Sequence, residues 1–158
     1  MSARAGLLLV FLATGAQADC AAARFALDGG LAYHSRADLT WMRCGVGLRW
    51  EQDGCVGATR RLGLEEARVA AREAGERWRL PTIRELAGLL DPTCGAPAID
   101  RRAFPDIAPN DEGKASYWSS TPAPDIPGMT YVVDFQNGDP DAHSSGIRLN
   151  VRLVREGR

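Results

Sequence analysis

The four cysteines of the 158-residue chain set the first limit on its fold. An even number of cysteines in an exported chain favours disulfide bonds over free thiols, and four cysteines allow three pairings. Cys44 and Cys55 would close a short loop, so we expect these two to pair, which leaves Cys20 to pair with Cys94. A zinc site is the alternative, but neither histidine lies near a cysteine in the sequence and no CxxC spacing occurs. Two bridges are therefore expected, each contributing on the order of 3 kcal/mol.

Residues 1–18 have the pattern of a secretory signal peptide. They contain one basic residue, Arg4, an apolar run over residues 7–13, and small residues up to a cleavage point after Ala18. The apolar run is too short to span a bilayer of about 30 Å, so no membrane insertion is expected once the signal is removed. We expect export to the periplasm or the extracellular space, and a single domain over residues 19–158.

The charge balance bears on the class of partner. The chain has 19 basic and 20 acidic residues, and loss of Arg4 with the signal peptide leaves a net charge of about −2. Nothing in this balance suggests a nucleic-acid partner or an anionic membrane surface. Strand alternation would place Arg148 and Arg152 on the solvent side of the last strand, where they could contact a sulfated glycan. Acidic residues are scattered among the arginines, so a solvated charged surface is the simpler interpretation.

Two helices are predicted. The stretch "LGLEEARVAAREAGE" is rich in alanine, glutamate and arginine, which predicts a helix over residues 64–74. In "RWRLPTIREL", Thr82 is a good N-cap and Glu85 can complete a capping box, so a short second helix should begin there and end near Asp91. Arg79 is expected to pair with a carboxylate or to face solvent. We interpret this stretch as a fold signature and not as an active site.

Strands are predicted at both ends of the domain. Residues 31–44 alternate apolar and polar side chains in two pieces. Near the C-terminus "TYVVDF" predicts a strand, Asn137 and Gly138 form a turn signal, and "IRLNVRLVR" alternates, so a C-terminal hairpin is expected. The proline-rich segment before it carries Phe104 and Tyr117, and large aromatic side chains indicate a long loop folded onto a core.

The order of these segments resembles a bacterial family. The resemblance rests on "LTWMRC", "RWEQDGCVG", "WRLPTIREL", "YWSST", "VVDFQNG" and "VRLVR", and it runs from about residue 24 to 155. The chain is similar to the Lcl C-terminal domain, a domain of unknown function named after a bacterial collagen-like adhesin. This resemblance implies an α+β, C-type-lectin-like or formylglycine-generating-enzyme-like fold, with a small, mostly antiparallel sheet, two helices and long irregular loops. Many relatives have a cysteine in the last strand where this chain has Leu153, so their disulfide maps do not transfer.

The resemblance also implies an exported recognition module. Members of the family are typically exported, and the adhesin that lends its name is associated with sulfated glycosaminoglycans, although fold kinship alone does not transfer function. We expect a disulfide-stabilised module that binds a glycan or a cell-surface protein through the loops after residue 95. The alternative is a structural or assembly component of the bacterial envelope or of a surface appendage. The oligomeric state is not predicted.

The candidate ligand-binding residues lie in the last third of the chain. Trp118 could stack on a sugar ring, but "YWSST" more simply predicts a short buried segment. Calcium could bind in "DFQNGDPDAH", but the spacing does not fit an EF-hand loop and turn chemistry explains the same residues without a ligand. No metal or cofactor is therefore expected. The candidates are Trp118, Asn137, Asp139, Asp141, His143, Arg148 and Arg152.

No enzymatic activity is expected. The segment "DAHSSG" places Asp141, His143, Ser144 and Ser145 together, but neighbours in one loop rarely assemble a catalytic triad. No nucleophile-elbow pattern surrounds either serine. The formylglycine-generating relatives rely on cysteine chemistry, and every cysteine here has an expected disulfide partner. A hydrolase centred on His143 is the least favoured alternative.

Overall fold

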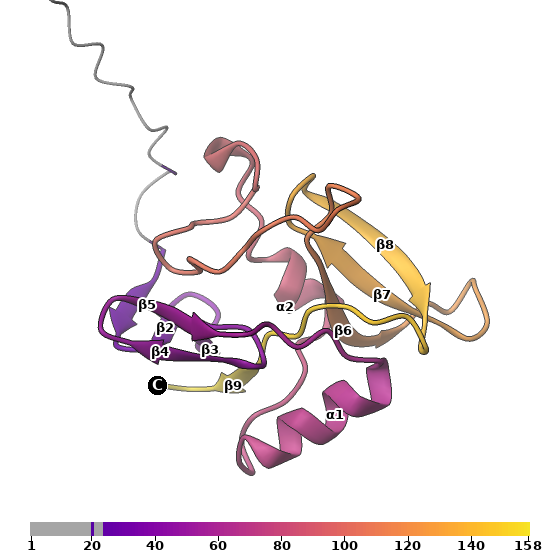
Figure 1. Cartoon of the computed structure of the whole chain (residues 1–158), viewed down its shortest axis with the longest axis horizontal. Helices are drawn as coiled ribbons and strands as arrows, with labels where there is room; N and C mark the ends of the chain where they lie inside the picture. The colour runs from indigo at the N-terminus through magenta and orange to yellow at the C-terminus, as the bar shows by residue number, and fades with distance from the viewer. Residues whose placement is uncertain (1–19, 21–23) are drawn as a thin grey trace, which may run out of the picture.

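Antiparallel sheets and two α-helices make up the computed structural model, which describes Cys20 and residues 24–158 (Figure 1). The fold is α+β, as the sequence predicts. The predicted signal peptide lies outside the described residues. Within the described part, no helix is long and apolar enough to cross a membrane. The elements are β1 (Ala26–Asp28), β2 (Leu31–His34), β3 (Leu39–Met42), β4 (Leu48–Glu51), β5 (Gly54–Gly57), α1 (Leu64–Glu73), α2 (Ile83–Ala87), a 3-10 turn η1 (Pro92–Cys94), β6 (Ser116–Pro122), β7 (Met129–Asp134), β8 (Asp139–Ser144) and β9 (Val154–Glu156).

The strands form three sheets. The first has the order β1-β2-β3-β9, the second contains β4 and β5, and the third has the order β6-β7-β8. The first sheet combines strands from the two ends of the domain, because β9 pairs antiparallel with β3 and places Leu39 opposite Glu156. The two pieces predicted within residues 31–44 are confirmed as β2 and β3, which pair with each other.

The predicted C-terminal hairpin is wrong in its second strand. The strand predicted from "TYVVDF" is confirmed as β7, and the chain turns at Gly138, whose φ of +80° suits glycine. The partner of β7 is β8, from the segment that we expected to be a loop. Residues 148–153 form no regular strand. Isolated bridges join Leu149 to Leu62 and Asn150 to Tyr117, and residues 151–153 are buried.

Burial of residues 151–153 also corrects the predicted position of Arg152. The side chain of Arg152 is 0% exposed, so its expected place on the solvent face is wrong, whereas Arg148 is exposed as predicted. Arg152 donates to the carboxylate of Asp106 at 2.6 Å and to two main-chain carbonyls. These acceptors replace the water that would otherwise solvate a guanidinium. The polar positions of the alternating sequence therefore do not identify a solvent-exposed face here.

The third sheet separates two hydrophobic clusters. In β6, Tyr117 belongs to the cluster that packs beneath α2, and its neighbour Trp118 belongs to the cluster that packs against α1. Successive side chains of a strand point to opposite faces, so β6 and β7 supply both clusters at once. Trp118 is 0% exposed and donates its indole N–H to the carbonyl of Leu62 at 2.8 Å. The prediction of a short buried segment at "YWSST" is confirmed.

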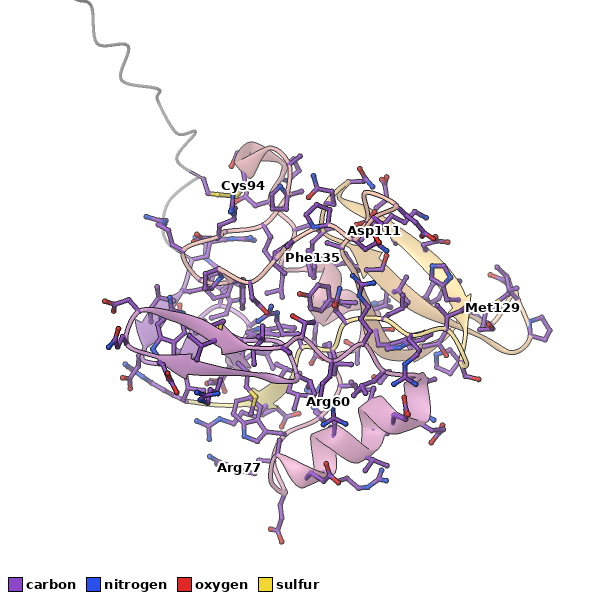
Figure 2. The ribbon with its side chains drawn as sticks, in the orientation of Figure 1. Arg60, Arg77, Cys94, Asp111, Met129 and Phe135 are labelled. Atoms are coloured by element: carbon purple, nitrogen blue, oxygen red, sulfur yellow. A yellow bond between two sulfur atoms is a disulfide. The ribbon has the colours of Figure 1, made fainter. Side chains whose placement is uncertain are left out.

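The long segment between η1 and β6 folds onto the first cluster. Phe104 and Ile107 are buried there together with Phe135, which Figure 2 shows in the interior, while Asp111 lies at the surface. The predicted loop folded onto a core is therefore confirmed around Phe104, but it is wrong at Tyr117, which lies in strand β6. Apolar burial at these positions offsets the entropy lost when an irregular segment is ordered.

Both helices begin where the sequence predicts. α1 confirms the helix expected over residues 64–74 and buries its leucine and alanine face against the second cluster. α2 begins after Thr82, whose hydroxyl accepts the N–H of Glu85 while the Glu85 carboxylate accepts the N–H of Thr82. This capping box is confirmed, but α2 ends at Ala87, several residues before the predicted end, and the chain leaves the helix at Gly88.

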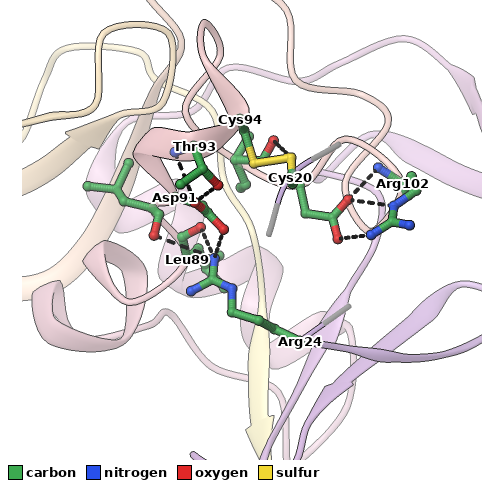
Figure 3. The surroundings of a disulfide bond; sticks show 10 residues. Cys20, Arg24, Leu89, Asp91, Thr93, Cys94 and Arg102 are labelled. Carbon is green, nitrogen blue, oxygen red and sulfur yellow. Dashed lines mark hydrogen bonds and ion pairs between the residues drawn. A yellow bond between two sulfur atoms is a disulfide. The ribbon is translucent and has the colours of Figure 1, made fainter. Parts of the chain in front are cut away.

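Both predicted disulfides are present. Cys44 pairs with Cys55, and Cys20 pairs with Cys94, so the described residues contain no free cysteine. Figure 3 shows Arg24 close to the second bridge, where it donates to the main-chain carbonyl of Leu89 at 3.0 Å. The bridge and this hydrogen bond together hold the start of the domain against the segment that follows α2.

Candidate functional site

A cleft of about 500 Å³ opens between the first sheet and α2. Strands β2, β3 and β9 line one wall, and α2 with the two residues after it lines the other. The cleft combines apolar side chains with charged ones, which is the usual composition of a small-molecule site. Its walls come from segments that are far apart in the sequence, so the cleft exists only when the first sheet and α2 have both formed.

His34 and Trp41 belong to the sheet wall. His34 lies opposite Leu39 in the β2–β3 register, and Trp41 follows Leu39 by two positions, so all three occupy one face of the sheet. Burial lowers the pKa of His34, and the positive charges of Arg24 and Arg36 lower it further. The imidazole of His34 is therefore predominantly neutral at pH 7.

The helix wall depends on an ion pair between Arg79 and Glu85. The two side chains form two hydrogen bonds of 2.8 Å each, and the Glu85 carboxylate also accepts the N–H of Thr82 at 2.7 Å. Burial raises the pKa of Glu85, but the hydrogen bonds from Arg79 and Thr82 outweigh it and hold that pKa below its usual range. The guanidinium of Arg79 also lies 3.6 Å from Glu156. One arginine thus pairs with both glutamates that line the cleft, and the three side chains together keep one negative charge.

We expect replacement of Glu85 by glutamine to lower the free energy of unfolding by about 1 kcal/mol at pH 7, because it weakens both the ion pair and the helix cap. The folded-state pKa of Glu85 is depressed, so this stabilisation is present above the unfolded-state pKa of about 4.3 and is lost as pH falls through the folded-state value. Urea unfolding at pH 7 and pH 3 measures the difference. Glu73→Gln, at an exposed position of α1, is the matched control. An equal loss at both pH values would contradict this account.

Donors in the cleft are less well satisfied than acceptors. Among the described residues, neither the guanidinium of Arg84 nor the imidazole of His34 has a hydrogen-bond or ion-pair partner. Trp41 is 1% exposed, and its indole nitrogen is buried without an acceptor. By contrast, the carboxylate of Asp38 already accepts the hydroxyl of Tyr33 at 2.9 Å. Arg84 and His34 therefore keep free N–H donors at the cleft, while Asp38 and Glu156 keep free acceptor positions.

The residues predicted from sequence do not line this cleft. Trp118 and Arg152 are buried in the core and present no surface to a ligand. Arg148 lies at the surface and pairs with Glu66 at 3.0 Å. Asp141 contacts His143 on β8 at 3.5 Å and Lys114 at 3.9 Å. The remaining candidates, Asn137 and Asp139, lie at the β7–β8 turn and at the start of β8.

The segment considered for calcium stabilises a turn. Asp134 is 5% exposed and accepts the N–H groups of Ala115 and Gln136 through one carboxylate oxygen. Its second oxygen accepts the side-chain amide of Asn137 at 2.6 Å. In the described part of the chain, no three histidine, cysteine, aspartate or glutamate side chains come together as a metal site would require. The turn explains the conformation of these residues.

A serine triad is not assembled around His143. The side chain of His143 lies near Asp141, but within the described residues no hydrogen bond joins it to Ser144 or Ser145. Consecutive residues of β8 alternate between the two faces of the sheet, which separates Ser144 from His143.

Sequence reasoning missed the cleft because its residues belong to segments that we interpreted as fold signals. His34, Leu39 and Trp41 contribute to strand alternation, and Arg84 lies within the capped helix start. The available signal was the polar residue His34 on the same strand face as buried apolar residues. The motif "RWRLPTIREL" is a fold signature, as predicted, and it also supplies part of one wall of the cleft.

The structure defines a disulfide-bonded α+β domain in which an antiparallel sheet and a capped helix form the two walls of an open cleft. The model of the Lcl C-terminal domain family matches residues 30–155, and the chain belongs to that family. The match covers most of the chain and includes all residues that line the cleft except Glu156. No curated protein matched this chain.

Proposed function

We propose that this chain is an exported recognition module with a C-type-lectin-like fold that holds its ligand in the cleft between the first sheet and α2. The two disulfides support an oxidising environment such as the periplasm or the cell exterior. Membership of the Lcl C-terminal domain family supports a surface-related role. A glycan or a cell-surface polypeptide is the class of ligand that fits such a role.

The cleft is the observation that carries this proposal. Its volume of about 500 Å³ lies within the usual range for small-ligand sites, roughly 300 to 1,000 Å³. Arg84 and His34 provide polar groups that can orient a ligand, and the apolar lining residues Leu39 and Leu89 are 7% and 1% exposed. This combination supports binding of one sugar unit or of one short chain end.

A recognition module is favoured over the two alternatives, a hydrolase and a structural component of the envelope. The contacts of His143 give no support to a hydrolase, because its described side-chain ion-pair partner is Asp141 and no serine hydroxyl is bonded to it. A permanently packed envelope component requires a contiguous apolar surface. Among the described residues, the large hydrophobic side chains that are exposed are those of Leu27, Val69, Ile126 and Ile147, each less than half exposed. A module that binds a ligand agrees better with this surface.

A ligand screen, repeated on a variant whose cleft is filled by a larger side chain, tests the proposal. Residues 19–158 are screened by thermal shift against glycans and cell-surface polypeptides, with calcium and with a chelator. A ligand at about one hundred times its Kd should stabilise the protein by about 2.7 kcal/mol, which raises Tm by several degrees. Calcium is not expected to be required.

Ala37→Trp is expected to abolish the shift, because Ala37 lines the cleft and a large side chain there fills it. Ala108→Trp, at an exposed loop position outside the cleft, is the matched control and should keep the shift. The proposal is wrong if the folded protein responds to no member of the panel. It is also wrong if Ala37→Trp binds as well as the unchanged protein.

A further inference from the structure

The carboxylates that line the cleft are already engaged within the protein. Both oxygens of Glu85 accept hydrogen bonds from Arg79, and one of them also accepts the N–H of Thr82. Glu156 lies beside the same guanidinium, and Asp38 accepts the hydroxyl of Tyr33. A ligand therefore meets acidic groups whose acceptor positions are partly occupied and whose negative charge is partly neutralised.

The basic groups at the cleft are free by comparison. Arg84 has no partner among the described residues, although its guanidinium carries five N–H donors. The imidazole of His34 packs against the ring of Phe25 but makes no hydrogen bond or ion pair among the described residues, and burial together with the positive charges of Arg24 and Arg36 lowers its pKa. Arg84 and His34 are therefore the lining side chains whose N–H donors are free for a ligand, although three carboxylates also line the cleft.

We propose that the ligand in this cleft carries a carboxylate, which Arg84 binds through its guanidinium and His34 binds through an imidazole N–H. The proposal rests on the proposed function and names the chemistry of the bound group. Arginine recognises carboxylates because its planar N–H groups match the two oxygens. The cleft volume of about 500 Å³ limits the size of the ligand, so the fitting class is a small organic carboxylate.

Two pairs of probes separate the carboxylate from the rest of the ligand. N-acetyl-L-leucine is compared with N-acetyl-L-leucinamide, and D-glucuronate is compared with D-glucose, by NMR titration of the folded protein. In at least one pair the acid should bind at least tenfold more tightly than its neutral partner, and the pair that responds distinguishes an amino-acid source from a sugar source. Equal binding of acid and neutral partner in both pairs would overturn the proposal, and so would a failure of both acids to bind.

Arg84→Gln tests the proposed contact. The side chain of Arg84 makes no contact that the fold needs, so the variant should remain folded and should lose about tenfold in affinity for the acid. Its affinity for the neutral partner should not change. Arg72→Gln, at an exposed position of α1 outside the cleft, should bind both probes normally. Unchanged affinity of Arg84→Gln for the acid would contradict the assignment.

The pH dependence of binding gives an independent readout. The charged groups around His34 are Arg24, Arg36, Asp38, Arg84, Glu85 and Glu156. A bound carboxylate adds negative charge and raises the pKa of His34, so binding should take up a proton and strengthen as pH falls from 8 to 6. His34→Gln should remove this dependence. A neutral ligand that binds in the cleft, with both acids inactive, would leave the proposed function standing and would refute the carboxylate.

Discussion

Replacing Asp106 by alanine is expected to lower the free energy of unfolding by about 3–5 kcal/mol. The side chains of Arg152 and Asp106 are 0% and 3% exposed, and their ion pair is 2.6 Å long. Removal of the carboxylate leaves a buried guanidinium without its counter-charge and also deprives the N–H of Gly45 of its acceptor. Tm should fall by roughly 10–20 °C, which thermal and urea unfolding can measure.

Two variants show whether the unpaired charge causes this loss. Asp111→Ala, at an exposed position of the same long segment, should change the free energy of unfolding by less than about 0.5 kcal/mol. The double variant Asp106→Leu with Arg152→Met should be more stable than Asp106→Ala alone, because it removes both charges. Recovery should be incomplete, since Arg152 also donates to the carbonyls of Met42 and Arg43. A double variant less stable than Asp106→Ala would show that the uncompensated charge is not the cause.

Replacing both Cys20 and Cys94 by serine is expected to cost about 4 kcal/mol. The bridge joins residues 74 positions apart. A disulfide lowers the conformational entropy of the unfolded chain, and this reduction grows with the length of the loop that the disulfide closes. The same relation gives about 3 kcal/mol for the bridge between Cys44 and Cys55, whose cysteines are only 11 positions apart. Urea unfolding of the two double-serine variants measures both costs.

Reduction provides the control for the serine substitutions. Reduced protein that carries all four cysteines should lose about as much stability as a variant that lacks both bridges, because reduction opens the same loops. Intact mass before and after reduction verifies that the bridges were present. A larger loss for the Cys44 and Cys55 variant than for the Cys20 and Cys94 variant would contradict the loop-length argument.

Local signals predicted the parts of this fold that depend on neighbouring residues. The capping box at Thr82 and Glu85 is a three-residue interaction, so the sequence alone predicts where α2 begins. The alternation in β3 and the short loop between Cys44 and Cys55 are similarly local. The pairing of Cys20 with Cys94 followed from the first pairing, because four cysteines leave no other partners.

Interactions between distant segments were not predictable in the same way. The alternation around Arg152 looks the same whether its polar side faces water or a buried carboxylate, and only Asp106, far from it in sequence, distinguishes the two. The hairpin partner of β7 was misassigned because β8 contains residues typical of loops, such as Asp139 and Pro140, whereas the segment after it alternates like a strand. The cleft depends on the packing of α2 against the first sheet, for which single-segment patterns carry no signal.

The pairing of β9 with β3 determines when during synthesis the domain can reach its native state. The hydroxyl of Thr40 donates to the carbonyl of Gly157, a contact between residues 117 positions apart. The wall that carries Trp41 therefore stays incomplete until residues 154–157 are available. Contacts of such long sequence separation slow folding, because the loop must close before the contacts stabilise it. A nascent chain consequently cannot complete its first sheet before residue 157 has been made.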